Sequence, residues 1–195
     1  MEKEFWMYYF IIINIAGFLL FLLNTWFRKH TEKGKIDGIL NVVSVMGGTA
    51  GVLLSMLAFD RKVQKENVMS KVFNICVLVI QIVILLAVKG HLGENITFAF
   101  WKFFEKYKIL TIYLGIVNLV TFVVFAIDKW KAVRQKSRIK IVTLLGLAFV
   151  GGSLGGLIAM YLFRHKTTKD YFTVGIPLIM VMQIVVIFYV MNRGL

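Results

Sequence analysis

The chain has few charged residues, and none lies at the centre of a long apolar run. Only 17% of its 195 residues are Asp, Glu, Lys or Arg, whereas 59% are hydrophobic. Six runs reach the roughly 20 apolar residues that a helix needs to cross a hydrocarbon layer. They cover about residues 5–27, 36–59, 68–89, 109–127, 140–163 and 171–192. Unpaired backbone groups are costly in lipid, so each run is predicted to be a helix. The sequence therefore predicts an all-α polytopic membrane protein with six transmembrane helices.

Residues for metal binding and catalysis are also scarce. The single cysteine, Cys76, lies inside the third run, which excludes an intramolecular disulfide and a cysteine-rich metal site. The three histidines, His30, His91 and His165, fall in separate loops without the spacing of a ligand pair. No carboxylate pair and no Ser–His–Asp arrangement can be assembled. We predict no catalytic residue, no metal and no cofactor, and an enzyme is the less favoured class.

Basic residues dominate what charge there is, with a formal net charge of +13. Because they flank the apolar runs, we expect them to meet anionic lipid head groups rather than nucleic acid. A bacterial plasma membrane is the expected location. The two faces carry nearly equal numbers of Lys and Arg, and the dense cluster at 129–140 only slightly favours an N-terminus inside. A homo-oligomer is left open.

The chain repeats itself at a constant offset. Fifteen of the 57 positions from 9 to 65 are identical to the residue 104 positions later. The identities include an asparagine, a tryptophan, a glycine pair and two lysines, which two unrelated apolar segments would hardly share. We predict a first unit at 1–93, a linker at 94–108 and a second unit at 109–195. Three crossings in each unit would place the second upside down relative to the first, giving a 3+3 inverted repeat of the kind seen in transporters.

The linker has a pattern of its own. Aromatic residues and lysines fall on different faces of a helix at 94–108, which is typical of an amphipathic helix at the lipid–water interface.

The second unit resembles a bacterial membrane domain family of unknown function, some of whose members also carry a cold-shock domain. The residues that carry the resemblance are Asn118, Asp128-Lys129-x-x-Ala132, Arg138-Ile139, Gly151-Gly152-x-x-Gly155, Arg164-His165-Lys166-Thr167, Phe172 and Pro177. They span about residues 110–192. The first unit looks like a diverged copy with Asn24 in place of Asp128. The resemblance implies a membrane location and no activity.

Small residues recur on one face of the second and fifth runs. The predicted packing glycines are Gly47, Gly48, Gly51, Gly151, Gly152, Gly155 and Gly156. Such faces let helix backbones approach closely in lipid. We expect these two helices to cross near the axis that relates the units; the alternative is a glycine surface lining a narrow path.

Four amides inside the runs recur in both units: Asn14, Asn118, Gln81 and Gln183. Interhelical hydrogen bonding is their ordinary role, and a polar site for an ion or solute is the alternative. No ionisable residue lies mid-run, which disfavours proton-coupled transport.

The loop residues Asp128, Arg138, Arg164, His165 and Lys166 complete the candidate substrate-binding set. Asp128 and Arg138 are expected on the membrane face opposite to Arg164, His165 and Lys166. Head-group anchoring or binding of an anionic group by arginine would explain them. The favoured function is a small transporter or channel-like protein for an ion, small solute or anionic lipid. A membrane scaffold and a lipid-modifying enzyme are the alternatives.

Overall fold

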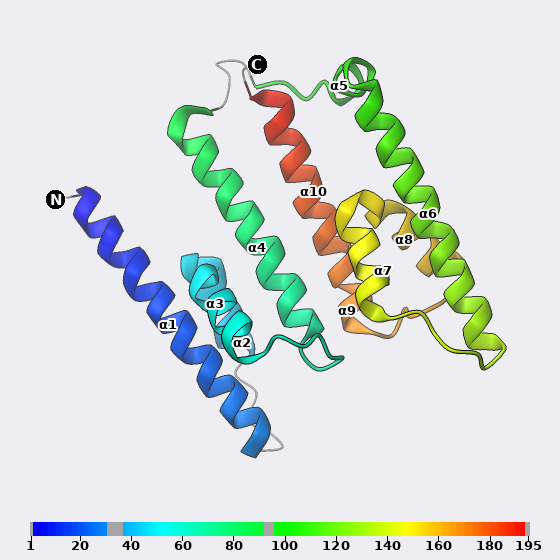
Figure 1. Ribbon diagram of the computed structural model, residues 1–195. Coiled ribbons are helices and arrows are strands. Elements are labelled where there is room, and N and C mark those ends of the chain that lie inside the picture. Colours follow the sequence, from blue (N-terminus) through cyan, green and yellow to red (C-terminus); the bar gives the residue numbers. More distant parts are fainter. Residues whose placement is uncertain (1, 31–36, 92–95, 194–195) are drawn as a thin grey trace. The chain divides into compact units, whose positions relative to one another are not determined.

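Helices make up the computed structural model, which describes residues 2–30, 37–91 and 96–193 (Figure 1). No strand occurs in these ranges. The α-helices are α1 (Glu2–His30), α2 (Asp37–Val43), α3 (Thr49–Phe59), α4 (Val68–Leu86), α5 (Phe100–Lys106), α6 (Lys108–Val133), α7 (Ile141–Leu147), α8 (Ser153–Leu162), α9 (Asp170–Thr173) and α10 (Gly175–Asn192). Three π-type turns, Ser44–Gly48, Ala87–His91 and Ala148–Gly152, complete the described helical elements.

The chain forms two compact units, Met1–Ile82 and Val83–Leu195, and the division falls inside α4. Six segments are long and apolar enough to cross a membrane, which confirms the predicted number of hydrophobic helices. They are Glu4–Phe27, Asp37–Phe59, Val68–Gly90, Lys108–Val133, Ile141–Leu162 and Asp170–Asn192. Each unit is described by itself below.

In the second unit the segment from α7 to α8 folds back on itself. Its start and its end both lie beside Asp128, near the end of α6: the Ile139 amide donates to Asp128 Oδ1 at 2.8 Å, and His165 Nε2 lies 2.8 Å from Oδ2. Its middle, Gly151, lies against Leu114. Leu114 and Asp128 are about 21 Å apart along a continuous helix that rises 1.5 Å per residue. The segment therefore runs along α6, turns and returns as a helical hairpin (Figure 1).

The outgoing arm of the first unit follows the same path. At its start, the Asn24 amide of α1 donates to Asp37 Oδ1 at 2.8 Å. At its tip, a Cβ on Gly47 would lie 3.0 Å from the Phe10 ring. Phe10 and Asn24 are also about 21 Å apart along α1. Helix α2 thus runs antiparallel to α1.

The returning arm, α3, runs parallel to α1. The Gly51 amide near its start donates to Asn14 Oδ1 at 2.8 Å, and the Phe59 ring at its end lies against Phe18 at 6.2 Å. The contacts advance along both helices in the same direction. The first unit therefore contains a hairpin equivalent to that of the second.

A single glycine makes each reversal possible. Gly47 has φ 111° and Gly151 has φ 124°, backbone values that only glycine adopts readily. Segments 36–59 and 140–163 are therefore helical hairpins and not single straight helices, although each is long and apolar enough to cross a membrane. The 3+3 inverted repeat stays a prediction.

Large apolar side chains fill the space between each hairpin and its neighbours. In the first unit Phe21, Leu40, Val52 and Met56 form one buried cluster. In the second unit the Phe125 and Phe172 rings meet edge to face at 5.7 Å, and both are fully buried. In each unit these contacts lie between the glycine turn and the base of the hairpin, near Asn24 in the first unit and near Asp128 in the second.

The predicted amphipathic helix at 94–108 is shorter in the structure. Helix α5 spans Phe100–Lys106, and Tyr107 (φ −102°, ψ 61°) separates it from α6. Residues 92–95 lie outside the described part of the chain. Phe103 is buried while Trp101 is 75% exposed, so the helix does present two different faces.

Candidate functional site

The tip of each hairpin leaves backbone groups without helical partners, and one asparagine from the first helix of the unit links both sides of the gap. Asn118 Nδ2 donates to Gly151 O at 2.8 Å, while its Oδ1 accepts the Gly155 amide at 2.7 Å. Only a carboxamide can donate and accept in this way. In the first unit Asn14 makes the same pair of bonds with Gly47 and Gly51.

A glutamine from the last helix completes each tip. Gln183 Nε2 donates to Ala148 O at 2.8 Å and to Phe149 O at 3.0 Å, and its Oε1 accepts the Ser153 hydroxyl. Gln81 bonds in the same manner. Its partners are Ser44 O, Val45 O and the Thr49 hydroxyl. A tyrosine hydroxyl, Tyr9 or Tyr113, donates to the carbonyl that precedes the glycine turn.

The predicted amides therefore meet within each unit, on the glycine turn of that unit's own hairpin. Their carboxamide groups are engaged with the backbone, and a role in substrate binding stays a prediction. The serine, threonine and tyrosine hydroxyls were not among the predicted site residues. Identity of Tyr9 and Tyr113 across the repeat was a usable signal for the tyrosines.

The packing glycines lie against the first helix of their own unit. A Cβ on Gly155 would overlap the backbone oxygen of Asn118, and one on Gly51 would overlap that of Asn14. A Cβ on Gly152 would overlap the Thr121 hydroxyl. A Cβ on Gly48 would lie 2.7 Å from Ile13 O, and one on Gly156 would lie 3.3 Å from Thr121 Cγ2. That these hairpins cross at an axis between the units stays a prediction.

Charged groups gather at the base of the second hairpin, around a carboxylate with no exposed surface. Asp128 Oδ2 accepts hydrogen bonds from Lys166 Nζ at 2.7 Å and from His165 Nε2 at 2.8 Å. Its Oδ1 accepts the Ile139 amide. Since a carboxylate is an acceptor, His165 donates from Nε2 and presents Nδ1 on the other side of its ring. Asp128 thus ties the beginning and the end of the hairpin to α6.

The expected separation of Asp128 from His165 and Lys166 on opposite faces is wrong, because the hairpin returns to its starting level. Arg138 is exposed and directly precedes Ile139, whose amide is on Asp128. Burial is the largest influence on the Lys166 ammonium and lowers its pKa; Asp128 opposes this, and the Arg138 charge lowers the pKa further. Arg138 and Lys166 are thus linked through Asp128, which binds the Ile139 amide and the Lys166 ammonium.

The backbone at this cluster is strained. Arg164 has φ 44° and Lys166 has φ 62°, values uncommon for residues with a side chain. The two flank His165 and turn consecutive side chains towards one carboxylate. Such conformations persist where the surrounding structure enforces them, and they often mark functional positions. The Lys166 ammonium also lies 4.6 Å from the centre of the Phe172 ring.

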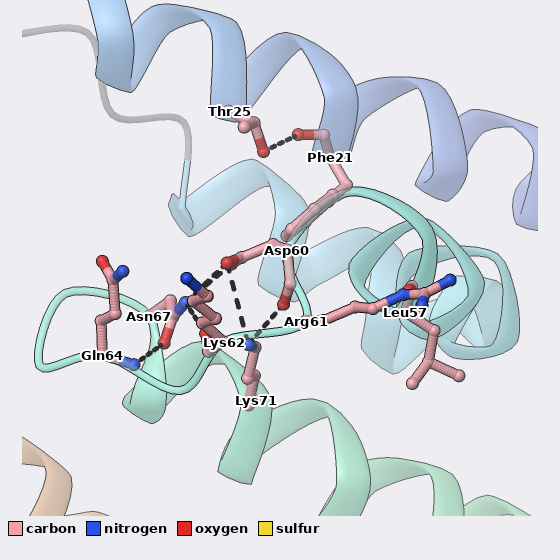
Figure 2. Close-up of polar contacts among 9 residues, drawn as sticks. All are labelled: Phe21, Thr25, Leu57, Asp60, Arg61, Lys62, Gln64, Asn67 and Lys71. Atoms are coloured by element: carbon pink, nitrogen blue, oxygen red, sulfur yellow. Dashed lines mark hydrogen bonds and ion pairs between the residues drawn. The ribbon is translucent and has the colours of Figure 1, made fainter.

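In the first unit the charged side chains that follow the hairpin have different partners (Figure 2). Asn67 Nδ2 donates to both oxygens of Asp60 at 2.8 Å. The Lys71 ammonium donates to the backbone oxygens of Asp60 and Lys62, and lies 3.8 Å from Asp60 Oδ1. Its donors are thus engaged by the loop that follows α3. No group of His, Cys, Asp and Glu suited to a metal ion occurs among the described residues of either unit.

Comparisons with known proteins match the second unit. Residues 118–172 match a family described as "Protein of unknown function (DUF1294)". The "Uncharacterized protein YsdA" of Bacillus subtilis (strain 168) is 42% identical over 79 residues, which are 40% of this chain and 89% of that protein. The chain belongs to this bacterial family of unknown function. No solved structure matches it. The matched range contains Asn118, the whole hairpin, Asp128 and its two side-chain partners, His165 and Lys166. The DUF1294 pattern thus coincides with the parts that build this fold and its charged cluster.

Proposed function

We propose that the chain is a multi-pass protein of the bacterial plasma membrane, with two like units arranged in tandem. The buried share of each apolar segment is small, between 11% and 39%, so much apolar surface faces outward. That is expected in lipid. The Bacillus relative is little longer than one unit, which supports a duplication of an independently folding unit.

Each unit then crosses the membrane twice and inserts one re-entrant hairpin between the crossings. Two crossings return the chain to the side from which it started. Non-helical backbone at membrane depth is tolerated where protein surrounds it, and the amides at each tip supply that protection.

The function that this geometry supports best is transport of an ion, small solute or anionic lipid. This proposal rests on the chain reversals at Gly47 and Gly151. Each reversal places broken helix ends inside an apolar segment. Transporters build their pathways from broken helices of this kind. In the second unit a cavity of about 380 Å³ lies beside the turn, lined by Leu110, Tyr113, Leu114, Phe149, Val150, Gly151, Met182, Gln183, Val186 and Ile187.

Cysteine accessibility tests the topology. In a Cys76→Ala background, single cysteines at Ser137, Thr168 and Lys102 mark the beginning of the hairpin, its end and the opposite end of α6. An impermeant maleimide should label Ser137→Cys and Thr168→Cys from one side of sealed vesicles, and Lys102→Cys from the other. Labelling of the first two from opposite sides would contradict the hairpin and restore three crossings.

Flux assays test transport itself. The purified chain in liposomes should move at least one of potassium, chloride, phosphate or a fluorescent phospholipid faster than protein-free liposomes. Gln183→Leu removes three hydrogen bonds from the hairpin tip and should change that rate. Leu162→Ala, a substitution at an exposed position, is the control for Gln183→Leu. Equal rates with and without protein for every probe would reject transport.

A lipid-modifying enzyme is the second candidate. The 2.8 Å contact between Asp128 and His165 favours it, because a carboxylate that holds one imidazole nitrogen leaves the other to accept a proton. Release of fatty acid or head group from phospholipid vesicles, lost in His165→Gln, would support this alternative. A scaffold is the third candidate, and it is favoured by the hydrogen bonds that engage all the tip amides with the backbone. If the chain shows neither flux nor turnover of lipid, the scaffold is the function that remains.

A further inference from the structure

The charged cluster at the base of the second hairpin has more positive charge than its single carboxylate can neutralise. Asp128 supplies one negative charge. Lys166 bonds to it, and Arg138 directly precedes Ile139, whose amide also bonds to Asp128. The Arg138 charge further lowers the pKa of Lys166. The Arg138 side chain makes no ion pair or hydrogen bond within the described ranges, and it is exposed.

Donors remain available on Lys166 and Arg138, and His165 adds a ring nitrogen without a partner. Lys166 has three N–H donors, of which one points to Asp128 in the described structure. His165 bonds through Nε2 and leaves Nδ1 free of partners among the described residues. Arg138 keeps its planar set of N–H groups, which match the oxygens of a phosphate or carboxylate in pairs. The strained backbone at Arg164 and Lys166 holds two of these groups side by side.

We propose that Arg138, His165 and Lys166 form a binding site for a phosphate-class anion, with Asp128 as the buried carboxylate that positions the last two. This deepens the proposed function by naming a ligand class, and it rests on that function only for the membrane setting. A bound phosphate supplies the negative charge that two adjacent cations need. The phosphate belongs to a lipid head group or to a soluble anion, and the two share this chemistry.

The first unit does not offer the same site. At the position of Lys166 it has Lys62, and at the position of Asp128 it has Asn24. Its half-buried lysine, Lys71, already donates to the backbone oxygens of Asp60 and Lys62 (Figure 2). The first unit therefore provides matched control positions within the same chain.

The test measures the thermal unfolding midpoint of the full chain in an uncharged detergent. Three probes are titrated: inorganic phosphate, short-chain phosphatidylglycerol and short-chain phosphatidylcholine. A ligand that binds the folded state raises the midpoint in a concentration-dependent way. Inorganic phosphate should act by itself if the site takes a soluble anion. Phosphatidylglycerol should act, and phosphatidylcholine not, if it takes an anionic head group.

Four variants decide whether the site is specific. Arg138→Gln and Lys166→Gln should each weaken the apparent affinity about tenfold, because each removes a charge-assisted hydrogen bond. Lys62→Gln, in the first unit, and Arg134→Gln, in the same basic loop, should leave it within about twofold. Arg138 is exposed, so Arg138→Gln keeps the test valid if Lys166→Gln does not fold.

Equal weakening in all four variants would overturn the proposal in favour of general attraction to a basic surface. Absence of a midpoint change with every phosphate-bearing probe would overturn it as well. Binding that depends on Arg138 but occurs without flux in liposomes would leave this site standing and reject transport.

Discussion

The two units build the same hairpin tip but different hairpin bases. At the tips, Asn14 and Asn118 bridge equivalent backbone groups, and Gly47 and Gly151 turn the chain in the same way. At the bases, Asp128 binds a lysine and a histidine, whereas its counterpart Asn24 donates to Asp37. The tip is needed for folding in each unit, because any broken helix must satisfy its backbone groups. The base is free to differ, and that freedom identifies the charged cluster as the specialised part of the second unit.

The largest expected effect tests the shared tip. Gly155→Val places side-chain atoms where the Asn118 backbone lies, and should lower the free energy of unfolding by more than about 4 kcal/mol, enough to prevent folding. Gly51→Val should do the same in the first unit. SDS titration in mixed micelles measures both. The controls are Gly146→Val and Gly38→Val, where a Cβ meets nothing within 4 Å. A fully stable Gly155→Val would mean that the helices are not in contact as described.

Exchanging the residues at the hairpin bases comes next. Asp128→Asn leaves the half-buried Lys166 ammonium without its carboxylate, and should cost about 3 kcal/mol. Asn24→Asp places a second carboxylate against Asp37 Oδ1 and should also destabilise the chain. The same titration measures both exchanges. If Asp128→Asn is neutral, the two bases are energetically alike and the contrast between the units fails.

Removing the donor of the bridging amide has a smaller effect that should be equal in both units. Asn118→Asp and Asn14→Asp keep the shape of the side chain but cannot donate to the glycine carbonyl. Each should cost about 2 kcal/mol. Asn41→Asp is the control, because Asn41 makes no side-chain hydrogen bond in the described residues. A loss confined to one unit would show that the tips are not equivalent.

The smallest effect concerns the cavity beside Gly151. Leu114 lies where the first unit has Phe10, whose ring packs on Gly47. Leu114→Phe should fill part of the cavity and change the stability by less than about 1 kcal/mol. Any flux through the second unit should fall in this variant if the cavity belongs to the pathway. Unchanged flux with unchanged stability would separate the cavity from transport.

Sequence reasoning predicted the number of hydrophobic helices and the family. It also singled out the asparagines, glutamines and glycines of both tips, but not the hydroxyl groups that bond there. It did so because hydropathy over about 20 residues is a local property, and because the repeat pointed to Asn118 and Gln183. It missed that Asp128 meets His165 and Lys166. Those residues are 37 positions or more from Asp128, and their meeting depends on the direction of the chain between them.

By itself, the sequence determined which segments are helical and which are apolar enough for lipid, and it pointed to most of the glycines at which a side chain has no room. It did not point to Gly17, where a Cβ would overlap Gly48 O. Only the tertiary structure decided that Gly47 and Gly151 reverse the chain. A glycine inside an apolar helix is compatible with continuation as well as with reversal, and the choice depends on partners from other helices. Here Asn118 and Gln183 satisfy the opened backbone, and Asp128 holds the two ends of the hairpin together.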